Sequence, residues 1–571
     1  MNMRFRWASI ILVLSPAWLF AQDEKQLAPV TRTYAITNAA IIQGPGRKID
    51  KGTVIIKDGL ITSVGITGSI PPEAIVIKAD SMFIYAGFID GLTRAGVNKP
   101  KDENKEKIKD PGNPPPDRAG ITPQVDVRNF LNPSDKALEE LRNLGFTTAQ
   151  VVPYGNLFPG QAAIVLTGAE SADRMVLLSK SSMYSELTGA TQLYPATILG
   201  VMAKWREVYR QAAQAKSYEG MYASNRAGLE RPEMDRTLEA FYPVIDQKMP
   251  VIFKSEKFMD AFRILKLKDE LGFTAVLADL KDGWPVVSKL KASNSKIFLS
   301  LDLPEEVKKD EKKNDKKSDK KDEKKPEAVP KEKTPAEIEK DALDKRKLEA
   351  IASYAAQAAT FQKAGISFGF SSLSVKSKDI PTNLRRMIAA GLTPDAALAA
   401  LTTTPAQLLG LSDRMGSIDN GKMANLVITD KCYFDEKAKV RYVFVDGVMY
   451  KMEVKETPKK TDGATAKAEI EGSWSTITQS PQGNTDGKLV FKIEGTNYSG
   501  TMSSARMPVP VELKDINLDG TTLSFNYIVN FGGNSIKVEV EVSIDGDSLK
   551  GTSSVGTFGS FPTEGTKDPK N

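Results

Sequence analysis

The first part of the chain alternates apolar and polar residues in short runs. Tyr34–Ile42 and Gly52–Gly65 both follow this period of two, and Asp58-Gly59 between two such runs is a strong hairpin turn signal. A further run covers Ala74–Ile77. The pattern predicts short β-strands joined by tight turns.

From residue 82 onward, continuous apolar runs alternate with helical stretches. The predicted strands are Phe83–Asp90, Gly145–Val152, Val251–Phe253, Thr274–Leu277 and Lys296–Leu301. The predicted helices are Asp135–Leu144, Phe258–Leu271, Trp284–Lys291, Thr334–Ala364, Leu384–Ala390 and one that starts at Thr393. Such alternation indicates parallel strands covered on both faces. Over this length it favours a (β/α)8 TIM-like barrel, with an open doubly wound sheet as the alternative.

Two segments interrupt these patterns. Residues 304–348 contain a run, Lys308–Lys325, that is almost only Lys, Asp and Glu, which predicts a solvated disordered insert that ends at the start of a helix. A nucleic-acid-binding tail is the weaker interpretation, because acidic residues are mixed into the run. Residues 453–468 are rich in Lys, Thr, Gly and Ala and predict a linker. Evenly spaced strands then predict a small antiparallel β-domain over residues 469–556, either lipocalin-like or a sandwich.

The N-terminus has the layout of a Sec-type signal peptide. Arg4 and Arg6 precede an apolar run, Ala8–Phe20, and Ala21 ends it. The run is short for a membrane span and contains Pro16. We therefore expect residues 1–21 to be cleaved and the protein to be periplasmic or secreted, with no membrane span after cleavage.

Composition narrows the chemistry further. The net charge of +6 is small for 571 residues and the basic residues are interspersed with acidic ones, so we expect no nucleic-acid partner. Cys432 is the one cysteine, which rules out an intramolecular disulfide. The sequence contains no histidine at all. Histidine-based metal sites and Ser-His-Asp triads are therefore excluded.

Two segments resemble the amidohydrolase superfamily. The first is Ala86-Gly-Phe-Ile-Asp90 with the alternating strands before it. The second is Gly391–Leu411, which runs on into Gly416–Asp430. A weaker similarity, to imidazolonepropionase-like members, lies in Gly145-Phe-Thr-Thr-Ala with Pro159-Gly-Gln-Ala-Ala. Together the resemblance covers about residues 30–452.

The resemblance implies a barrel with its site at the carboxyl ends of the strands. It implies a β-sandwich built from both flanks of that barrel, residues 30–85 and 413–452, with the barrel itself at 86–303 and 349–412. In active members of the family, one or two divalent metals activate water. Their ligands are two histidines after strand 1, histidines on strands 5 and 6 and an aspartate on strand 8, and in many members a strand 4 lysine bridges the metals.

This sequence departs from the family pattern at each of those positions. The strand 1 pair falls on Leu92 and Arg94, and the strand 5 position falls on Lys254. Strand 6 ends at Leu277-Ala-Asp279 and the strand 8 motif falls on Ser371-Ser-Leu373. We find no equivalent of the strand 4 lysine. The resemblance thus combines the family's scaffold with a changed set of side chains.

The cations and carboxylates near the expected barrel mouth have several interpretations. Asp90, Asp279 and Asp302 offer oxygen ligands, but a carboxylate-only Mg²⁺ or Ca²⁺ site needs more of them to converge. We therefore expect no cofactor. We favour salt bridges from Arg94 and Lys254 to Asp90 or Asp279, with an anion site as the second interpretation and covalent catalysis by lysine as a distant third.

Ser371 and Ser372 complete the candidate ligand-binding residues at the barrel mouth. We expect their hydroxyls to satisfy backbone groups at a strand end rather than to act as nucleophiles.

The leading functional hypothesis is an exported amidohydrolase-superfamily protein that has lost the standard metal site. It would bind a small anionic ligand or peptide, or act as a homo- or hetero-oligomeric partner of an active relative. The alternative is a non-classical hydrolase of carbon–nitrogen bonds in cyclic amides or peptides. Fold alone does not decide between them.

Overall fold

The computed structural model describes residues 33–66, 68–100, 108–306, 334–452, 469–480, 483–494, 497–505, 507–531, 534–555 and 559–569. The chain divides into two compact units, residues 1–454 and 455–571. The predicted signal peptide, the charged run at 308–325 and the linker at 453–468 lie outside the described residues.

One eight-stranded sheet joins the two flanks of the N-terminal unit. Its main path runs β16-β15-β14-β5-β1-β2-β3, and β4 pairs with β1. The link between the flanks is the antiparallel pairing of β5 with β14, in which Ala86 lies opposite Leu426. The strands are β1 (Tyr34–Gly44), β2 (Arg47–Lys57), β3 (Leu60–Gly65), β4 (Ile75–Lys78), β5 (Phe83–Ala86), β14 (Leu426–Thr429), β15 (Val440–Val445) and β16 (Val448–Lys451).

The second eight-stranded sheet corrects the prediction of a regular (β/α)8 barrel. Its order is β13-β12-β11-β10-β9-β8-β7-β6, and every pairing is parallel except those of β8, which runs antiparallel to both β7 and β9. Only eight residues separate β7 from β8, and a parallel crossover needs a dozen or more. The strands are β6 (Phe88–Thr93), β7 (Phe146–Val151), β8 (Gly160–Leu166), β9 (Val176–Glu186), β10 (Val251–Lys254), β11 (Ala275–Leu280), β12 (Lys296–Ser300) and β13 (Gly369–Ser371).

Side chains join the two edges of this mixed sheet. Ser371 Oγ donates to the carbonyl of Leu92 at 3.0 Å, and the Ser372 N–H donates to Asp90 Oδ1 at 3.0 Å. The sheet therefore curls until β13 lies beside β6. The expectation that these serines satisfy strand-end backbone groups holds for Ser371.

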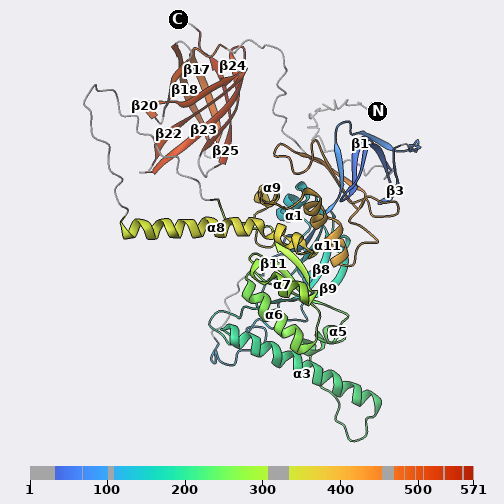
Figure 1. The fold of residues 1–571 in the computed structure, drawn as a ribbon. Coiled ribbons are helices and arrows are strands. Elements are labelled where there is room, and N and C mark those ends of the chain that lie inside the picture. Colours follow the sequence, from blue (N-terminus) through green and yellow to red (C-terminus); the bar gives the residue numbers. More distant parts are fainter. Residues whose placement is uncertain are drawn as a thin grey trace, which may run out of the picture. The chain divides into compact units, whose positions relative to one another are not determined.

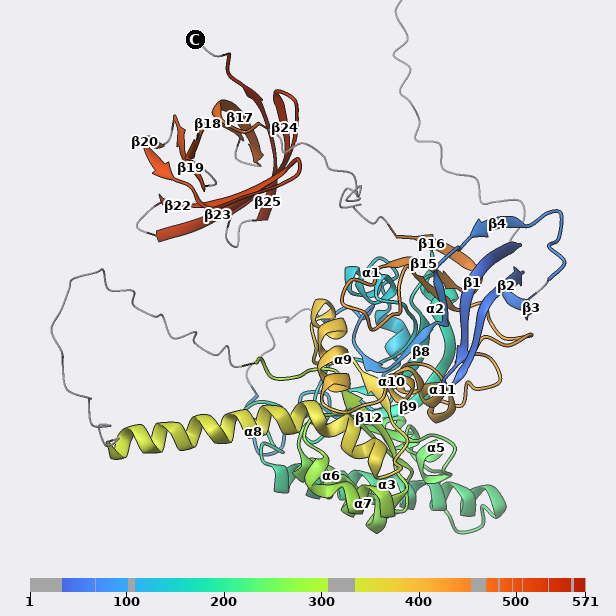
Figure 2. The same cartoon turned by 45° about the horizontal axis from the view of Figure 1, so that its top comes forward.

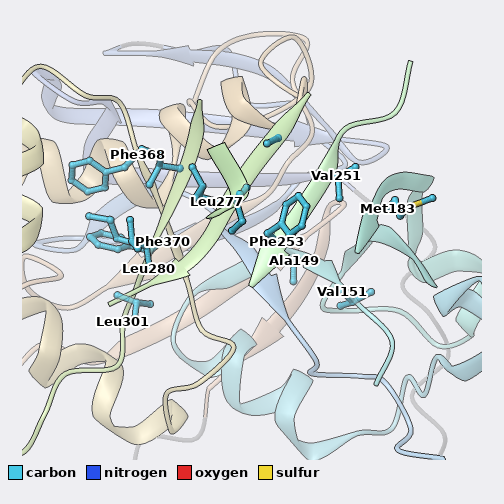
Figure 3. Packing of buried hydrophobic residues seen from close by; sticks show 14 of the residues in the cluster. Ala149, Val151, Met183, Val251, Phe253, Leu277, Leu280, Leu301, Phe368 and Phe370 are labelled. Carbon is cyan, nitrogen blue, oxygen red and sulfur yellow. The ribbon is translucent and has the colours of Figure 1, made fainter. Parts of the chain in front are cut away.

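Helices cover the outer face of the curled sheet (Figures 1 and 2). Apolar residues such as Val251, Phe253 and Leu277 point from the strands into this layer (Figure 3). Trp205 of α3 is fully buried in it and packs on the rings of Phe273 and Phe253. The helices of the layer include α3 (Ile198–Ser224), α5 (Tyr242–Ile245), α6 (Phe258–Leu271) and α7 (Val287–Ser293).

Local sequence signals set several helix boundaries. Asp135 caps α1 (Lys136–Asn143), and Thr393 accepts from the Ala396 N–H to cap α10 (Pro394–Leu401). Helix α6 ends at Gly272, which has a left-handed φ of 78°. Three further helices are α8 (Pro335–Lys363), α9 (Ile380–Ala389) and α11 (Thr403–Leu408). Helix α3 and the strands β8 and β9 were not predicted from the sequence.

The C-terminal unit is a nine-stranded antiparallel sheet, strongly curved in Figure 2. It runs from β17 (Gly472–Ser480) to β25 (Gly559–Lys567) and buries Trp474 in its core. The predicted end at residue 556 was wrong, because β25 pairs with both β17 and β24 in the middle of the sheet. Across both units, none of the helices in the described ranges has the length and apolar character that crossing a membrane requires.

Candidate functional site

The carboxyl ends of the strands carry the polar residues that the sequence singled out. Lys254 ends β10, Asp279 lies one residue before the end of β11, and Ser371 ends β13. Asp90 and Arg94 lie on and just after β6. Because parallel strands bring their carboxyl ends to one edge of a sheet, these residues share the same end of the curled sheet. We call this end the barrel mouth.

Apolar side chains fill the interior below the barrel mouth. Leu92 is fully buried in a cluster with Tyr184, Ile252 and Phe298, and Leu373 packs against the same cluster. The Phe298 ring lies so close to Gly91 that a Cβ there would be 2.0 Å from Cδ1 of the ring. The interior at this level is therefore packed with hydrocarbon.

Asp90 is fully buried and held by three hydrogen bonds. Its carboxylate accepts from the N–H groups of Leu92 (3.2 Å) and Ser372 (3.0 Å) and from the Ser372 hydroxyl. Burial nevertheless raises the pKa of Asp90 to about 7, because the hydrogen bonds only partly offset the loss of water. Asp90 is thus a carboxyl group that can change protonation near neutral pH.

Asp279 is the second buried carboxyl group of the barrel mouth. Its backbone has a left-handed φ of 58°, which is uncommon for a non-glycine residue and turns the end of β11. The Ser374 hydroxyl donates to its carboxylate, and Ser371 Oγ lies 3.4 Å away. Burial raises the pKa of Asp279 as well. The two buried aspartates therefore accept hydrogen bonds from serine hydroxyls, and within the described residues neither forms a salt bridge.

Arg94 pairs with Glu186 at the end of β9. Their side chains meet at 2.6 Å, and the Tyr184 hydroxyl also donates to Glu186 at 2.7 Å. The guanidinium of Arg94 lies 4.8 Å from the centre of the Tyr154 ring, a cation–π distance. This corrects the predicted partner of Arg94, which was Asp90 or Asp279. Glu186 ends the fourth strand of the sheet order, where many family members carry the bridging lysine.

Lys254 belongs to a second group of charges. It lies 3.4 Å from Glu256, which is also 3.5 Å from Lys281, and Lys281 bonds Asp302 at 2.7 Å. Glu256, not Asp90 or Asp279, is therefore the partner of Lys254. Although burial acts to raise the pKa of Glu256, Lys254 and Lys281 outweigh it and hold that pKa below its ordinary value.

Sequence reasoning missed Glu186, Glu256, Lys281 and Tyr184. The strand that carries Tyr184 and Glu186 was not predicted, because its residues alternate with serines and do not form an apolar run. Glu256 and Lys281 lie two residues after Lys254 and Asp279. That spacing could have identified them as site residues, because residues that follow the carboxyl ends of parallel strands lie at the same end of the sheet.

The donor set at the barrel mouth does not suit the metal that the family resemblance implies. Leu92 and Leu373 supply no donor atom, and the serines and cations nearby are poor ligands for a transition metal. Within the described ranges, no group of three or more Asp, Glu or Cys side chains is placed to hold a metal ion. The residues of the barrel mouth therefore do not fit a transition metal.

Comparison with known proteins finds similarity to amidohydrolases in both sequence and fold. Residues 310–453 match the amidohydrolase family. A crystal structure of an amidohydrolase from Thermotoga maritima MSB8 superposes with a TM-score of 0.56 at 19% identity, covering 73% of this chain and 100% of that one. No curated protein matches the sequence.

Two further solved structures show weaker similarity. A Xaa-Pro dipeptidase with methionine bound in its active site gives a TM-score of 0.39 at 13% identity, covering 74% of this chain and 100% of its own. Phenylurea hydrolase B gives 0.41 at 15%, covering 73% and 96%. The match to the amidohydrolase family is thus confined to residues 310–453, and the likeness to the Thermotoga maritima amidohydrolase is one of fold over 73% of this chain.

Proposed function

We propose that this protein is an exported, non-hydrolytic protein with an amidohydrolase-like scaffold, which acts as a binding partner and not as a metal-dependent enzyme. The imidazolonepropionase-like subtype remains a prediction from sequence. Export rests on the basic and apolar layout of residues 1–21.

The packing of Leu92 and Leu373 carries the proposal. These leucines occupy the positions where the resemblance places the first histidine and the strand 8 aspartate, and both pack into the apolar interior. A metal site needs polar ligands that converge on open space. The packed hydrocarbon around Leu92 and Leu373 supplies neither.

The ion pairs at the barrel mouth favour a scaffold role over the capture of a small anion. Arg94 is already paired with Glu186, and Lys254 shares Glu256 with Lys281. An incoming carboxylate would have to displace these intramolecular partners. The cations of the barrel mouth thus already have partners of opposite charge. We propose that this end of the curled sheet meets a partner chain, either a second copy or a catalytically active relative.

The decisive experiment measures metal and turnover together. We expect the purified full-length protein to contain substoichiometric zinc, manganese and iron by elemental analysis. We also expect no hydrolysis of cyclic amides or dipeptides with or without added Zn²⁺ or Mn²⁺. Stoichiometric metal together with metal-dependent turnover would refute the proposal. Leu92→Ala is the matched control. If Leu92 only packs the interior, the variant should be less stable and its turnover should not change. If Leu92 lies beside an active site, the variant should change the turnover.

The second candidate function is hydrolysis of carbon–nitrogen bonds without a metal. One observation favours it, namely that burial raises the pKa of both Asp90 and Asp279, which is the direction expected of a carboxyl group that acts as a general acid. Turnover that is independent of metal chelators and abolished by Asp279→Asn would support this candidate. The same assay panel without turnover would exclude these substrates.

A further inference from the structure

A groove lies between two helices of the outer layer. Helices α6 and α7 lie side by side (Figures 1 and 2), and the ammonium of Lys268 in the last turn of α6 donates to the carbonyl of Ser293 at the end of α7 at 3.0 Å. The groove has a volume of about 740 Å³, within the range of about 300–1,000 Å³ that is usual for binding pockets. Helix α6 supplies most of its lining, α7 supplies residues such as Lys289, and α3 supplies Met202.

The lining of this groove is strongly basic. One acidic residue, Asp269, accompanies four basic ones, which gives the lining a net charge of +3; the basic residues are Arg263, Lys266, Lys268 and Lys289. Arg263 is already paired with Asp260 at 2.7 Å. The three lysines form no salt bridge with any described residue. Unpaired cations that share one groove attract groups of negative charge.

Apolar side chains line the same groove. Leu265 is buried, and Met202 and Phe262 are half-buried. The ammonium of Lys289 lies 4.4 Å from the centre of the Phe262 ring, so a cation stands directly beside the hydrocarbon. Met259 lies three residues before Phe262, on the same face of α6, and is 44% exposed. The groove therefore combines partly exposed hydrocarbon with unpaired cations.

This combination suits an acidic protein segment better than a small anion or a nucleic acid. A phosphate or carboxylate ion alone would pair with a lysine and leave the hydrocarbon in water. Single-stranded nucleic acids stack their bases on aromatic rings, and Phe262, the one aromatic ring in the described lining, already carries Lys289 over its face. A peptide presents carboxylates and apolar side chains together, as segments that dock in grooves between helices do.

We propose that the groove between α6 and α7 docks an acidic segment of a partner protein. Carboxylates of that segment pair with Lys266, Lys268 and Lys289, and an apolar side chain of the segment packs on Phe262. The groove belongs to the outer helical layer, whereas the function proposed above concerns the barrel mouth. The inference therefore goes beyond that function and does not depend on it.

Fluorescence anisotropy with labelled peptides and the full-length protein tests the proposal. The probes are short polyglutamate peptides that carry two leucines three, four or seven positions apart. Their controls replace every glutamate by glutamine, or omit the leucines. We expect at least one probe to bind, to lose affinity as sodium chloride is added, and to bind at least fivefold more tightly than either control. Absence of binding by all the probes, or equal binding of a control, overturns the proposal, as does tighter binding of a labelled oligothymidylate.

Variants of surface residues assign the binding to the groove. The double variant Lys266→Gln, Lys289→Gln should weaken the binding of the acidic probe at least fivefold. The matched control is Lys291→Gln, since Lys291 is exposed on α7 but lies outside the lining, and it should leave the affinity unchanged. Circular dichroism checks that each variant is folded. Unchanged affinity in the double variant overturns the proposal, as does an equal loss in Lys291→Gln.

Two further measurements test the apolar contact and the choice of occupant. Phe262→Gln should weaken the probe that carries leucines and leave the weak binding of the leucine-free control unchanged, and Met202→Gln serves the same purpose if Phe262→Gln does not fold. An equal effect on both peptides overturns the apolar contact. Sedimentation analysis tests whether a second copy fills the groove. Oligomers that dissociate in the double lysine variant would mean that it does, which overturns the proposal of a different partner.

Discussion

Asp90 makes the stability of the N-terminal unit depend on pH. Burial raises its pKa from 3.8 to about 7 in the folded protein, and each unit corresponds to about 1.4 kcal/mol. The folded state therefore binds the proton more tightly than the unfolded chain does. The resulting stabilisation, about 4 kcal/mol, is fully present below about pH 4 and is lost as the pH rises through about 7.

Asp90→Asn removes this dependence while it keeps the shape of the side chain. The amide oxygen can still accept from the N–H groups of Leu92 and Ser372, and the amide nitrogen can donate to the Ser372 hydroxyl. The second amide hydrogen gains no partner, which costs about 1 kcal/mol. We therefore expect Asp90→Asn to be more stable than the wild type by about 3 kcal/mol at pH 8, and less stable than the wild type by about 1 kcal/mol at pH 4.

Urea denaturation followed by tryptophan fluorescence measures this difference. Trp205 and Trp284 report on the N-terminal unit, and the transition of Trp474 in the C-terminal unit should be the same in both proteins. Asp279, whose pKa is also raised by burial, makes the stability of both proteins fall as the pH rises. The quantity to compare is therefore the difference in the free energy of unfolding between Asp90→Asn and the wild type at each pH. A difference that stays constant from pH 4 to pH 8 would refute the reasoning.

Two further changes test the interior and the barrel mouth. Gly91→Ala should destabilise the protein by about 1–3 kcal/mol, because its Cβ would meet the buried Phe298 ring, and Phe298→Leu in the same chain should recover part of that loss in thermal denaturation. Glu256→Gln should cost less than about 1 kcal/mol, because the carboxylate that pairs with Lys254 and Lys281 is partly exposed. Since the pairing lowers the pKa of Glu256, the stabilisation by this carboxylate should be lost as the pH falls through that lowered pKa. A stability difference between the wild type and Glu256→Gln that stays constant at acid pH would contradict the pairing.

Much of the fold could be predicted because its signals are local. The caps Asp135 and Thr393 and the left-handed Gly272 act within one helical turn, so the helices beside them were placed to within a few residues. The strand β9 was missed because serines and a lysine interrupt its apolar residues. The strand β8 was missed although Ala162–Leu166 is a continuous apolar run. The direction of β8 depends on the short connection before it, which a pattern of apolar residues does not encode.

The sequence predicted which residues lie at the strand ends of the candidate site, but it did not predict which of them form ion pairs. Lys254, Asp279 and Ser371 do end or nearly end neighbouring strands of one sheet. The pairing of Arg94 with Glu186 joins residues from different strands, and Glu186 lay on a strand that was missed. Ion-pair partners follow from strand order and stagger, so residue type alone cannot assign them.

The sequence by itself determined which chemistry this protein is able to use. A chain that has no histidine, and has leucine at position 92, cannot supply the histidine ligands of the amidohydrolase superfamily that it resembles, whatever its conformation. Only the tertiary structure decided what surrounds the residues at those positions. It buried Asp90 beside the Ser372 hydroxyl, packed Leu92 into a cluster with Phe298 and paired Arg94 with Glu186. Burial and pairing are properties of surroundings assembled from distant segments, and those surroundings exist only once the sheet has curled.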